Sequence, residues 1–91
     1  MTRYTVTYTR DALQSLARLW LSAVNRRAIT LAGDSIDELL RDNAPDKGLP
    51  VGSTMRQVVV APLVAEFTVE EDDRIVTIRN VRHIGELTNG R

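Results

Sequence analysis

The residues best suited to chemistry lie near the end of the sequence, where a histidine follows two arginines. His83 is the only histidine among 91 residues, and imidazole is the side chain that exchanges protons near neutral pH. Arg79 and Arg82 precede it in a run whose composition is typical of a strand. Strict alternation along that strand places Arg79 and His83 on one face. The spacing therefore predicts an acid–base candidate beside a guanidinium on the open face of a sheet.

Three arginines are candidates for phosphate contact, because guanidinium groups bind phosphate oxygens with paired hydrogen bonds. Arg56 stands where the chain enters a strand, Arg74 begins the last strand, and Arg82 lies near the end of that strand. Glu66, on the neighbouring strand, is placed to orient or assist them. With Arg79, these arginines predict a local basic patch although the total charge is zero.

Each of these residues also has a plainer interpretation. Arg79 and Arg82 can pair with acidic residues of the facing strand, as oppositely charged cross-strand neighbours do. Arg56 can lay its aliphatic stem on the edge of the sheet. A single histidine at the end of a strand is more often an ordinary surface residue than a catalytic one. Both interpretations of His83 therefore stay open.

These side chains need a β-hairpin to position them, and residues 62–83 predict one. Apolar and polar residues alternate from 63 to 70, which is typical of a half-buried strand. Residues 71–73 are all acidic and form a turn, and residues 74–82 are rich in β-branched side chains. A connection this short makes the two strands antiparallel neighbours.

Near the N-terminus the sequence predicts a strand and two helices. Residues 3–8 suit a strand, and Thr9 is placed to cap the helix that follows. Asn25 separates this helix from a second one, so the two form an αα-hairpin. A kink or break at Gly33 is the alternative to a continuous second helix.

The first of these helices is apolar on more than half of its circumference. A helix with such a surface is either buried on two sides or docks a partner, and a domain of this size offers few second sides. Both interpretations of its apolar stripe stay open. The stripe contains Leu13, Leu16, Ala17, Trp20 and Val24.

The totals exclude several classes of function. The chain makes a single domain, residues 1–91, in which we expect residues 85–91 to form a flexible tail. There is no cysteine and only one histidine, so we expect no disulfide framework, no metal site and no cofactor. Twelve basic and twelve acidic side chains cancel, and no apolar run approaches the length of a membrane span. The sequence therefore predicts a soluble, cytoplasmic protein without a membrane partner.

The complete order of elements predicts a fold class. Proline and glycine mark residues 43–53 as a loop, and residues 54–61 form a strand that leads into the hairpin. The order is βααβββ, which predicts an α+β fold with a two-helix hairpin packed on one face of a small antiparallel sheet.

This order, with these residues, resembles the RelE/ParE superfamily of toxins from type II toxin–antitoxin systems, which includes plasmid-stabilisation proteins. The resemblance covers residues 4–83. Its most specific parts are the Tyr-Thr-Val opening strand, the helix ALQSLARLWL, the loop before Arg56 and the segment PLVAEFTVEEDDRIVTIRNVRH.

The resemblance implies a protein partner and two alternative targets. Members of the superfamily are neutralised by a cognate antitoxin that lies along the toxin surface. Leu13, Leu16 and Trp20 are the residues that we expect the antitoxin to contact. RelE-like members cut messenger RNA on the ribosome, whereas ParE-like members inhibit DNA gyrase and cut nothing themselves.

The ribonuclease branch assigns roles to the residues singled out above. Cleavage of this kind needs a general base, a general acid and a cation near the phosphate. His83 matches a histidine that some ribonuclease members carry at the end of the last strand. Within this branch, His83, Arg79 and Arg56 are the expected catalytic residues, and Arg82 and Arg74 the expected RNA-binding residues.

The sequence departs from the ribonuclease pattern at three positions. Val64 stands where ribonuclease members tend to have an arginine, and Ile84 stands where they tend to have a tyrosine. Lys47 is the only lysine, whereas RelE-like sites are rich in lysine and arginine. Three interpretations stay open: a RelE-type ribonuclease that needs no metal, a non-catalytic ParE-type inhibitor, and a divergent interaction domain without toxicity.

Overall fold

The computed structural model describes residues 3–52 and 54–84. These residues form five strands, two α-helices and one short 3-10 helix. Their bounds are β1 Thr5–Tyr8, α1 Arg10–Ser22, α2 Arg26–Leu40, η1 Ala44–Asp46, β2 Leu49–Pro50, β3 Arg56–Val60, β4 Leu63–Glu70 and β5 Ile75–His83. The tail expected over residues 85–91 lies outside the described residues.

The five strands form one sheet in the order β1-β5-β4-β3-β2. The pairs from β2 to β5 are antiparallel, as the sequence predicts for the hairpin, whereas β1 pairs with β5 in parallel. The expectation of a wholly antiparallel sheet is wrong at this edge, because no tight turn joins β1 to β5 and sets their relative direction. β2 lies inside residues 43–53, where the sequence predicts only a loop. The predicted α+β fold class is confirmed.

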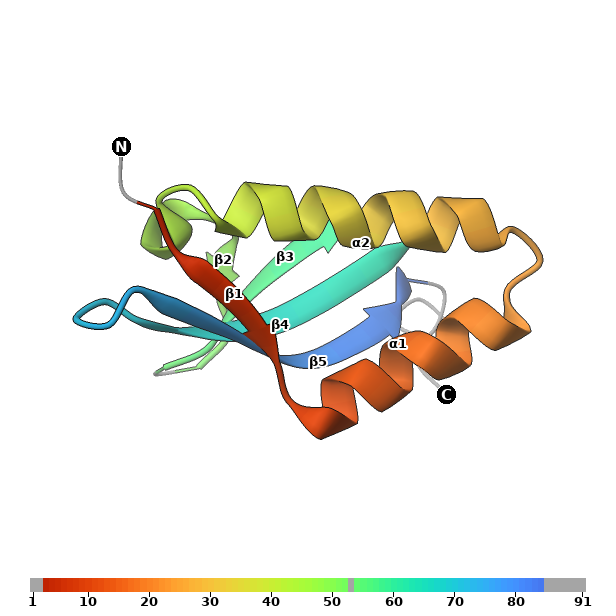
Figure 1. The fold of residues 1–91 in the computed structure, drawn as a ribbon, viewed down its shortest axis with the longest axis horizontal. Coiled ribbons are helices and arrows are strands. Elements are labelled where there is room, and N and C mark those ends of the chain that lie inside the picture. Colours follow the sequence, from red (N-terminus) through yellow and green to blue (C-terminus); the bar gives the residue numbers. More distant parts are fainter. Residues whose placement is uncertain (1–2, 53, 85–91) are drawn as a thin grey trace.

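Each of the two α-helices begins at a side chain that caps it. Thr9 Oγ1 accepts a hydrogen bond from the backbone N–H of Ala12, and Asn25 Oδ1 accepts one from that of Ala28. α2 runs without a break through Gly33, although glycine costs a helix interior about 1 kcal/mol relative to alanine. In Figure 1 the two helices meet at their short connection and diverge away from it, with β4 and β5 visible between them.

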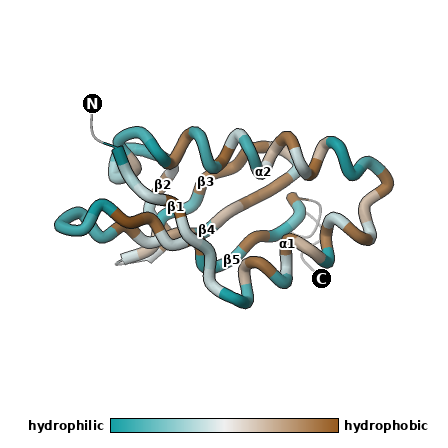
Figure 2. Tube along the Cα trace, viewed as in Figure 1, coloured by the Kyte–Doolittle hydropathy of each residue, from teal (hydrophilic) through white to brown (hydrophobic). Residues whose placement is uncertain are grey.

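The hydrophobic core lies between α2 and the sheet. α2 buries one face, and alternate residues of β4 and β5 meet it, as their periodicities predict. Figure 2 shows apolar stretches recurring along both helices, while the tip of the β4–β5 hairpin is hydrophilic. α1 contributes less to the core, because Ala12 is its only fully buried residue. The largest fully buried side chains described are Phe67, Ile36, Leu40, Leu63, Ile78, Val64 and Val76.

A β-bulge interrupts the hairpin near its centre. Asn80 pairs with Glu66 and Ile78 pairs with Phe67, so Arg79 is an extra residue in β5. The core-facing residues of β5 are therefore three positions apart across the bulge instead of two. For this reason the predicted common face of Arg79 and the histidine does not form.

Candidate functional site

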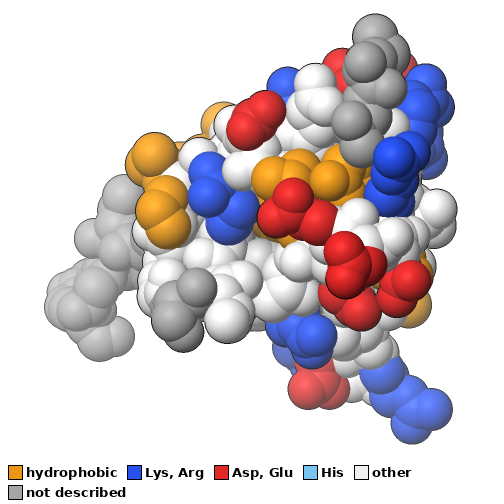
Figure 3. Space-filling view, turned by 90° about the vertical axis from the view of Figure 1, so that its left-hand side faces the viewer, with side chains coloured by type: hydrophobic (Ala, Val, Ile, Leu, Met, Phe, Trp, Pro, Cys, Tyr) orange, Lys and Arg blue, Asp and Glu red, His pale blue; other side chains and the backbone are white. Residues whose placement is uncertain are grey.

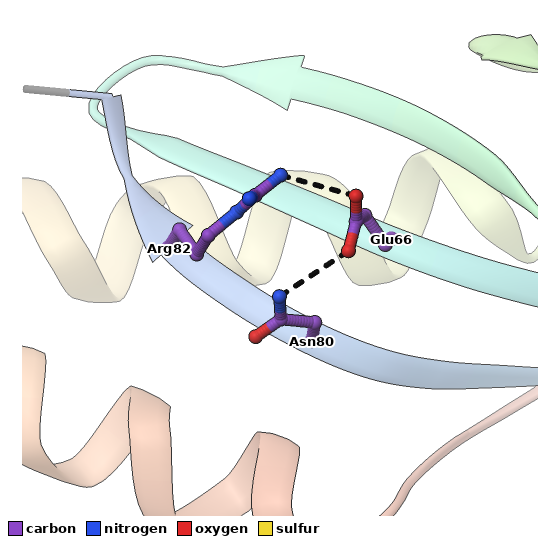
Figure 4. Close-up of polar contacts among 3 residues, drawn as sticks. All are labelled: Glu66, Asn80 and Arg82. Atoms are coloured by element: carbon purple, nitrogen blue, oxygen red, sulfur yellow. Dashed lines mark hydrogen bonds and ion pairs between the residues drawn. The ribbon is translucent and has the colours of Figure 1, made fainter. Parts of the chain in front are cut away.

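Three side chains form a polar cluster on the face of the sheet turned away from α2, which we call the outer face. The carboxylate of Glu66 accepts two hydrogen bonds from β5, one from Arg82 at 3.0 Å and one from Asn80 at 3.2 Å (Figure 4). The contact between Arg82 and Glu66 is an ion pair of two partly buried side chains. The plainer interpretation of Arg82, a cross-strand ion pair, is therefore confirmed.

Arg79 lies on the same outer face but forms different bonds. Its Nε donates to Thr68 Oγ1 at 3.0 Å, and its carbonyl oxygen accepts a hydrogen bond of 3.4 Å from Thr9 Oγ1. The side chain is exposed. Because Thr9 also caps α1, its bond to the carbonyl of Arg79 connects the bulge to the start of the first helix.

Arg74 lies just before the start of β5, and His83 is the last residue of that strand. His83 pairs with the core residue Leu63 and is partly buried. Arg74 lies in the hairpin turn with a left-handed backbone, φ 55°, and its carbonyl oxygen accepts a hydrogen bond from the N–H of Thr5. At about 3.3 Å per residue, the nine residues of β5 separate the two by roughly 30 Å. The two residues therefore do not belong to one site.

Arg56 holds the segment before β2 against β3. Its Nε donates to the carbonyl of Lys47 at 2.7 Å, and its Nη2 donates to the carbonyl of Gly48 at 2.9 Å. Gly48 has a φ of 69°, and a Cβ there would lie 2.2 Å from the carbonyl oxygen of Gln57. Only glycine fits this turn. The guanidinium of Arg56 thus has structural partners of its own.

The structure does not gather the predicted catalytic residues on one surface. Arg56 pairs with Phe67 and so shares the core side of the sheet, Arg79 lies on the outer face, and His83 ends β5. Figure 3 shows basic and acidic side chains lying next to one another, with no continuous basic surface on the face in view. The roles of these residues in chemistry stay a prediction.

The described part of the chain contains neither a metal-ligand cluster nor a helix that could span a membrane. No group of three or more histidine or acidic side chains within it is arranged to hold a metal ion. None of its helices has the length and apolarity needed to cross a membrane.

A groove of about 520 Å³ lies between α1 and α2. Its walls are mostly apolar, and the three residues that the sequence predicts to bind a partner, Leu13, Leu16 and Trp20, all line it. Leu13 is 52% exposed and Trp20 is 40% exposed. The structure therefore brings these three residues together on one open surface.

The α2 wall of the groove contains residues that sequence reasoning missed. Ile29, Thr30, Gly33 and Asp34 line it, and none of them is among the partner-binding residues that the sequence predicts. The sequence feature that could have identified them is the spacing of Thr30, Gly33 and Asp34, which places these three residues on one side of a helix. A glycine inside an otherwise regular helix is a second signal.

Trp20 closes the groove near the connection of the two helices. Its Nε1 donates to Thr30 Oγ1 at 3.1 Å, and the guanidinium of Arg26 lies 4.8 Å from the centroid of its ring. Arg26 also donates to the carbonyls of Trp20 and Leu21 at the end of α1. These contacts hold the indole in place as one end of the groove.

Tyr8 joins β1 to the other half of α2. Its hydroxyl donates to Asp37 Oδ1 at 2.6 Å. Burial of the phenol raises the pKa of Tyr8 well above its ordinary value near 10, and the hydrogen bond to Asp37 and the negative charges of Asp37 and Asp34 raise it further. The hydroxyl therefore stays protonated and keeps this bond at physiological pH.

Solved structures of RelE and ParE toxin–antitoxin systems share this fold. A chain of the RelBE2 toxin–antitoxin complex from Mycobacterium tuberculosis matches with a TM-score of 0.76 at 17% identity, covering 91% of this chain and 93% of that chain. A chain of the chromosomal ParDE system from P. aeruginosa gives a TM-score of 0.66 at 18% identity, covering 90% and 97%. The isolated E. coli RelE toxin gives 0.63 at 11% identity, covering 96% and 97%.

No protein-family model and no curated protein sequence matches the chain. At the identities above, the likeness establishes the fold, and the predicted RelE/ParE-like architecture is confirmed. RelE and ParE systems both occur among the structural matches, so the fold does not choose between the two targets.

Proposed function

We propose that this chain is the toxin subunit of a type II toxin–antitoxin module and that a cognate antitoxin neutralises it by covering the α1–α2 groove. The observation that carries the proposal is an exposed apolar groove on a RelE/ParE fold, lined by Leu13, Leu16 and Trp20. A protein that covers this groove removes leucine and tryptophan surface from water, which favours association.

For the target, we propose inhibition of DNA gyrase by binding, as in ParE-type toxins. Cleavage of RNA needs several polar groups around one phosphate, and Arg56, Arg79 and His83 lie on different parts of the sheet. Val64, where ribonuclease members tend to have an arginine, is fully buried. A net charge of zero provides no long-range attraction to ribosomal RNA. Gyrase acts in the cytoplasm, so the proposal places the chain there.

One observation favours the ribonuclease alternative. Arg82 and His83 are adjacent at the end of β5, and both are only partly buried. As neighbours in a strand they lie on opposite faces, so messenger RNA would have to pass around this end of the sheet to meet both the guanidinium and the imidazole. In this alternative His83 exchanges the proton and Arg82 contacts the phosphate.

Induction of this chain alone in a bacterial host separates the alternatives. We expect growth to stop while primer extension shows intact messages, and we expect the purified chain to inhibit supercoiling by gyrase. New cuts inside codons, lost in His83→Ala, would establish the ribonuclease instead. Normal growth with intact messages would contradict the toxin proposal and leave an interaction domain without toxicity.

A further inference from the structure

Gly33 stands in the wall of the α1–α2 groove, at a position where the fold does not require glycine. α2 is regular through this residue, and a Cβ added to it would meet no atom within 4 Å. Alanine would fit here and would strengthen the helix. The open space in front of Gly33 is the groove itself, so the absence of a side chain enlarges the groove.

A small residue of α1, Ala17, also lines the groove. It lies one turn before Trp20, which bonds to Thr30, and Gly33 lies one turn after Thr30. Leucines of α1 and the indole of Trp20 bound the space on either side. A gap between two small residues with large apolar walls accepts one large apolar side chain at close range.

The helical walls of the groove favour one secondary structure for a peptide segment bound between them. Both walls are helices, whose backbone groups are already bonded internally. An extended segment between them would find no strand edge, and its own N–H and C=O groups would lack partners. A helical segment satisfies its own backbone and presents apolar side chains at a spacing of three and four.

The rim of the groove beside Gly33 carries negative charge. Asp34 is exposed, and no ion pair to it is formed among residues 3–52 and 54–84. Asp37 lies one turn further along α2, where it accepts the hydrogen bond from Tyr8. A helix lying in the groove therefore gains from a lysine or arginine placed opposite Asp34.

We propose that a large apolar side chain from an amphipathic helix of the antitoxin packs against Gly33, a position that we call the seat. A lysine or arginine of the same helix contacts Asp34. The inference rests on the proposed function, since it takes the antitoxin as the occupant of the groove. Gly33 then selects the partner by size, and Asp34 selects it by charge.

The test uses the full chain and, as the binding partner, the purified protein encoded by the adjacent reading frame, with any tryptophan in it replaced by phenylalanine. Trp20 is the only tryptophan of this chain and lies in the groove, so its fluorescence reports occupancy. Gly33→Leu fills the seat. The matched control, Ser35→Leu, adds the same side chain at an exposed position of α2 outside the groove.

We expect Gly33→Leu to raise the Kd about 100-fold and Gly33→Ala to raise it about 5-fold, while the helical circular dichroism and the thermal midpoint stay at or above those of the wild type. Ser35→Leu should leave the Kd within about twofold. Asp34→Asn should raise the Kd about 5-fold and reduce its dependence on salt.

Three outcomes count against the inference, and they are distinguishable. If folded Gly33→Leu binds as tightly as the wild type, Gly33 is not the seat, although the antitoxin proposal stands. If the antitoxin binds and restores growth without changing the emission of Trp20, the groove is not its site. If it neither binds the wild-type chain nor restores growth, the proposed function fails and the inference fails with it.

Discussion

Replacement of Tyr8 by phenylalanine removes a single hydrogen bond from the junction of β1 and α2. The hydroxyl donates to Asp37 Oδ1 at 2.6 Å, between residues 29 positions apart in the chain. A hydrogen bond to a charged acceptor contributes about 1.5–3 kcal/mol, and solvent lowers that figure for a pair that is only partly buried. We expect Tyr8→Phe to lower the free energy of unfolding by about 1–2 kcal/mol at pH 7.

The same contact makes the stability depend on alkaline pH. Burial, the bond to Asp37 and the nearby negative charges raise the pKa of Tyr8 in the folded chain above its ordinary value near 10. Above that value the unfolded chain releases a proton that the folded chain keeps. The stabilisation is therefore complete below about pH 10 and is lost as the pH rises, at up to about 1.4 kcal/mol per pH unit.

Urea unfolding of the wild type and Tyr8→Phe from pH 7 to pH 11 measures both effects. Tyr4 is present in both chains, so it does not enter the difference between them. We expect the wild type to be more stable at pH 7 and the difference to approach zero near pH 11. Asp37→Asn, which retains an acceptor but removes the charge, should show a weaker dependence on pH. A difference that stays constant up to pH 11 would refute the proposed coupling between Tyr8 and Asp37.

Substitutions at three further positions test the fold and the polar cluster. Gly48→Ala forces a Cβ to within 2.2 Å of a backbone oxygen at a φ of 69°, so we expect thermal unfolding to show a loss of about 2 kcal/mol or more. Phe67→Ala empties a fully buried position and should cost about 3–5 kcal/mol in urea unfolding, with Phe67→Leu costing clearly less. Glu66→Gln weakens the ion pair to Arg82, and we expect a loss of no more than about 1 kcal/mol; a larger loss would mean that the outer-face cluster carries more of the fold than its exposure suggests.

The elements that the sequence predicts correctly are those determined by local patterns. The change from a period of two to a helical period locates the hairpin and both helices, and Thr9 and Asn25 cap the helices as expected. β2 was missed because a strand of two residues is too short to show a periodicity. The parallel pairing of β1 with β5 joins opposite ends of the chain, so no local pattern reports it.

The candidate site was harder to predict because one extra residue in β5 moves the side chains of the residues after it to the opposite face of the sheet. The bulge at Arg79 shifts the alternation of β5, so Asn80 and Arg82 share the outer face and both reach Glu66. An alternation argument has no means of locating a bulge in a strand whose residues near it are polar. The cross-strand ion pair between Arg82 and Glu66 was one of the alternatives left open, because it depends only on the composition of the two strands.

The position of α1 explains why its apolar stripe is left uncovered. β1 pairs with β5 only as far as Ile78, and α1 packs mainly against β5 rather than against α2. α2 diverges from α1 (Figure 1), and Leu13 and Leu21 are 52% and 63% exposed. Apolar surface gathered on one side of a small domain favours association with another molecule. Of the two explanations that the sequence leaves open for this helix, burial on two sides is therefore wrong, and a partner that covers the groove, as proposed above, would remove the cost of exposing it.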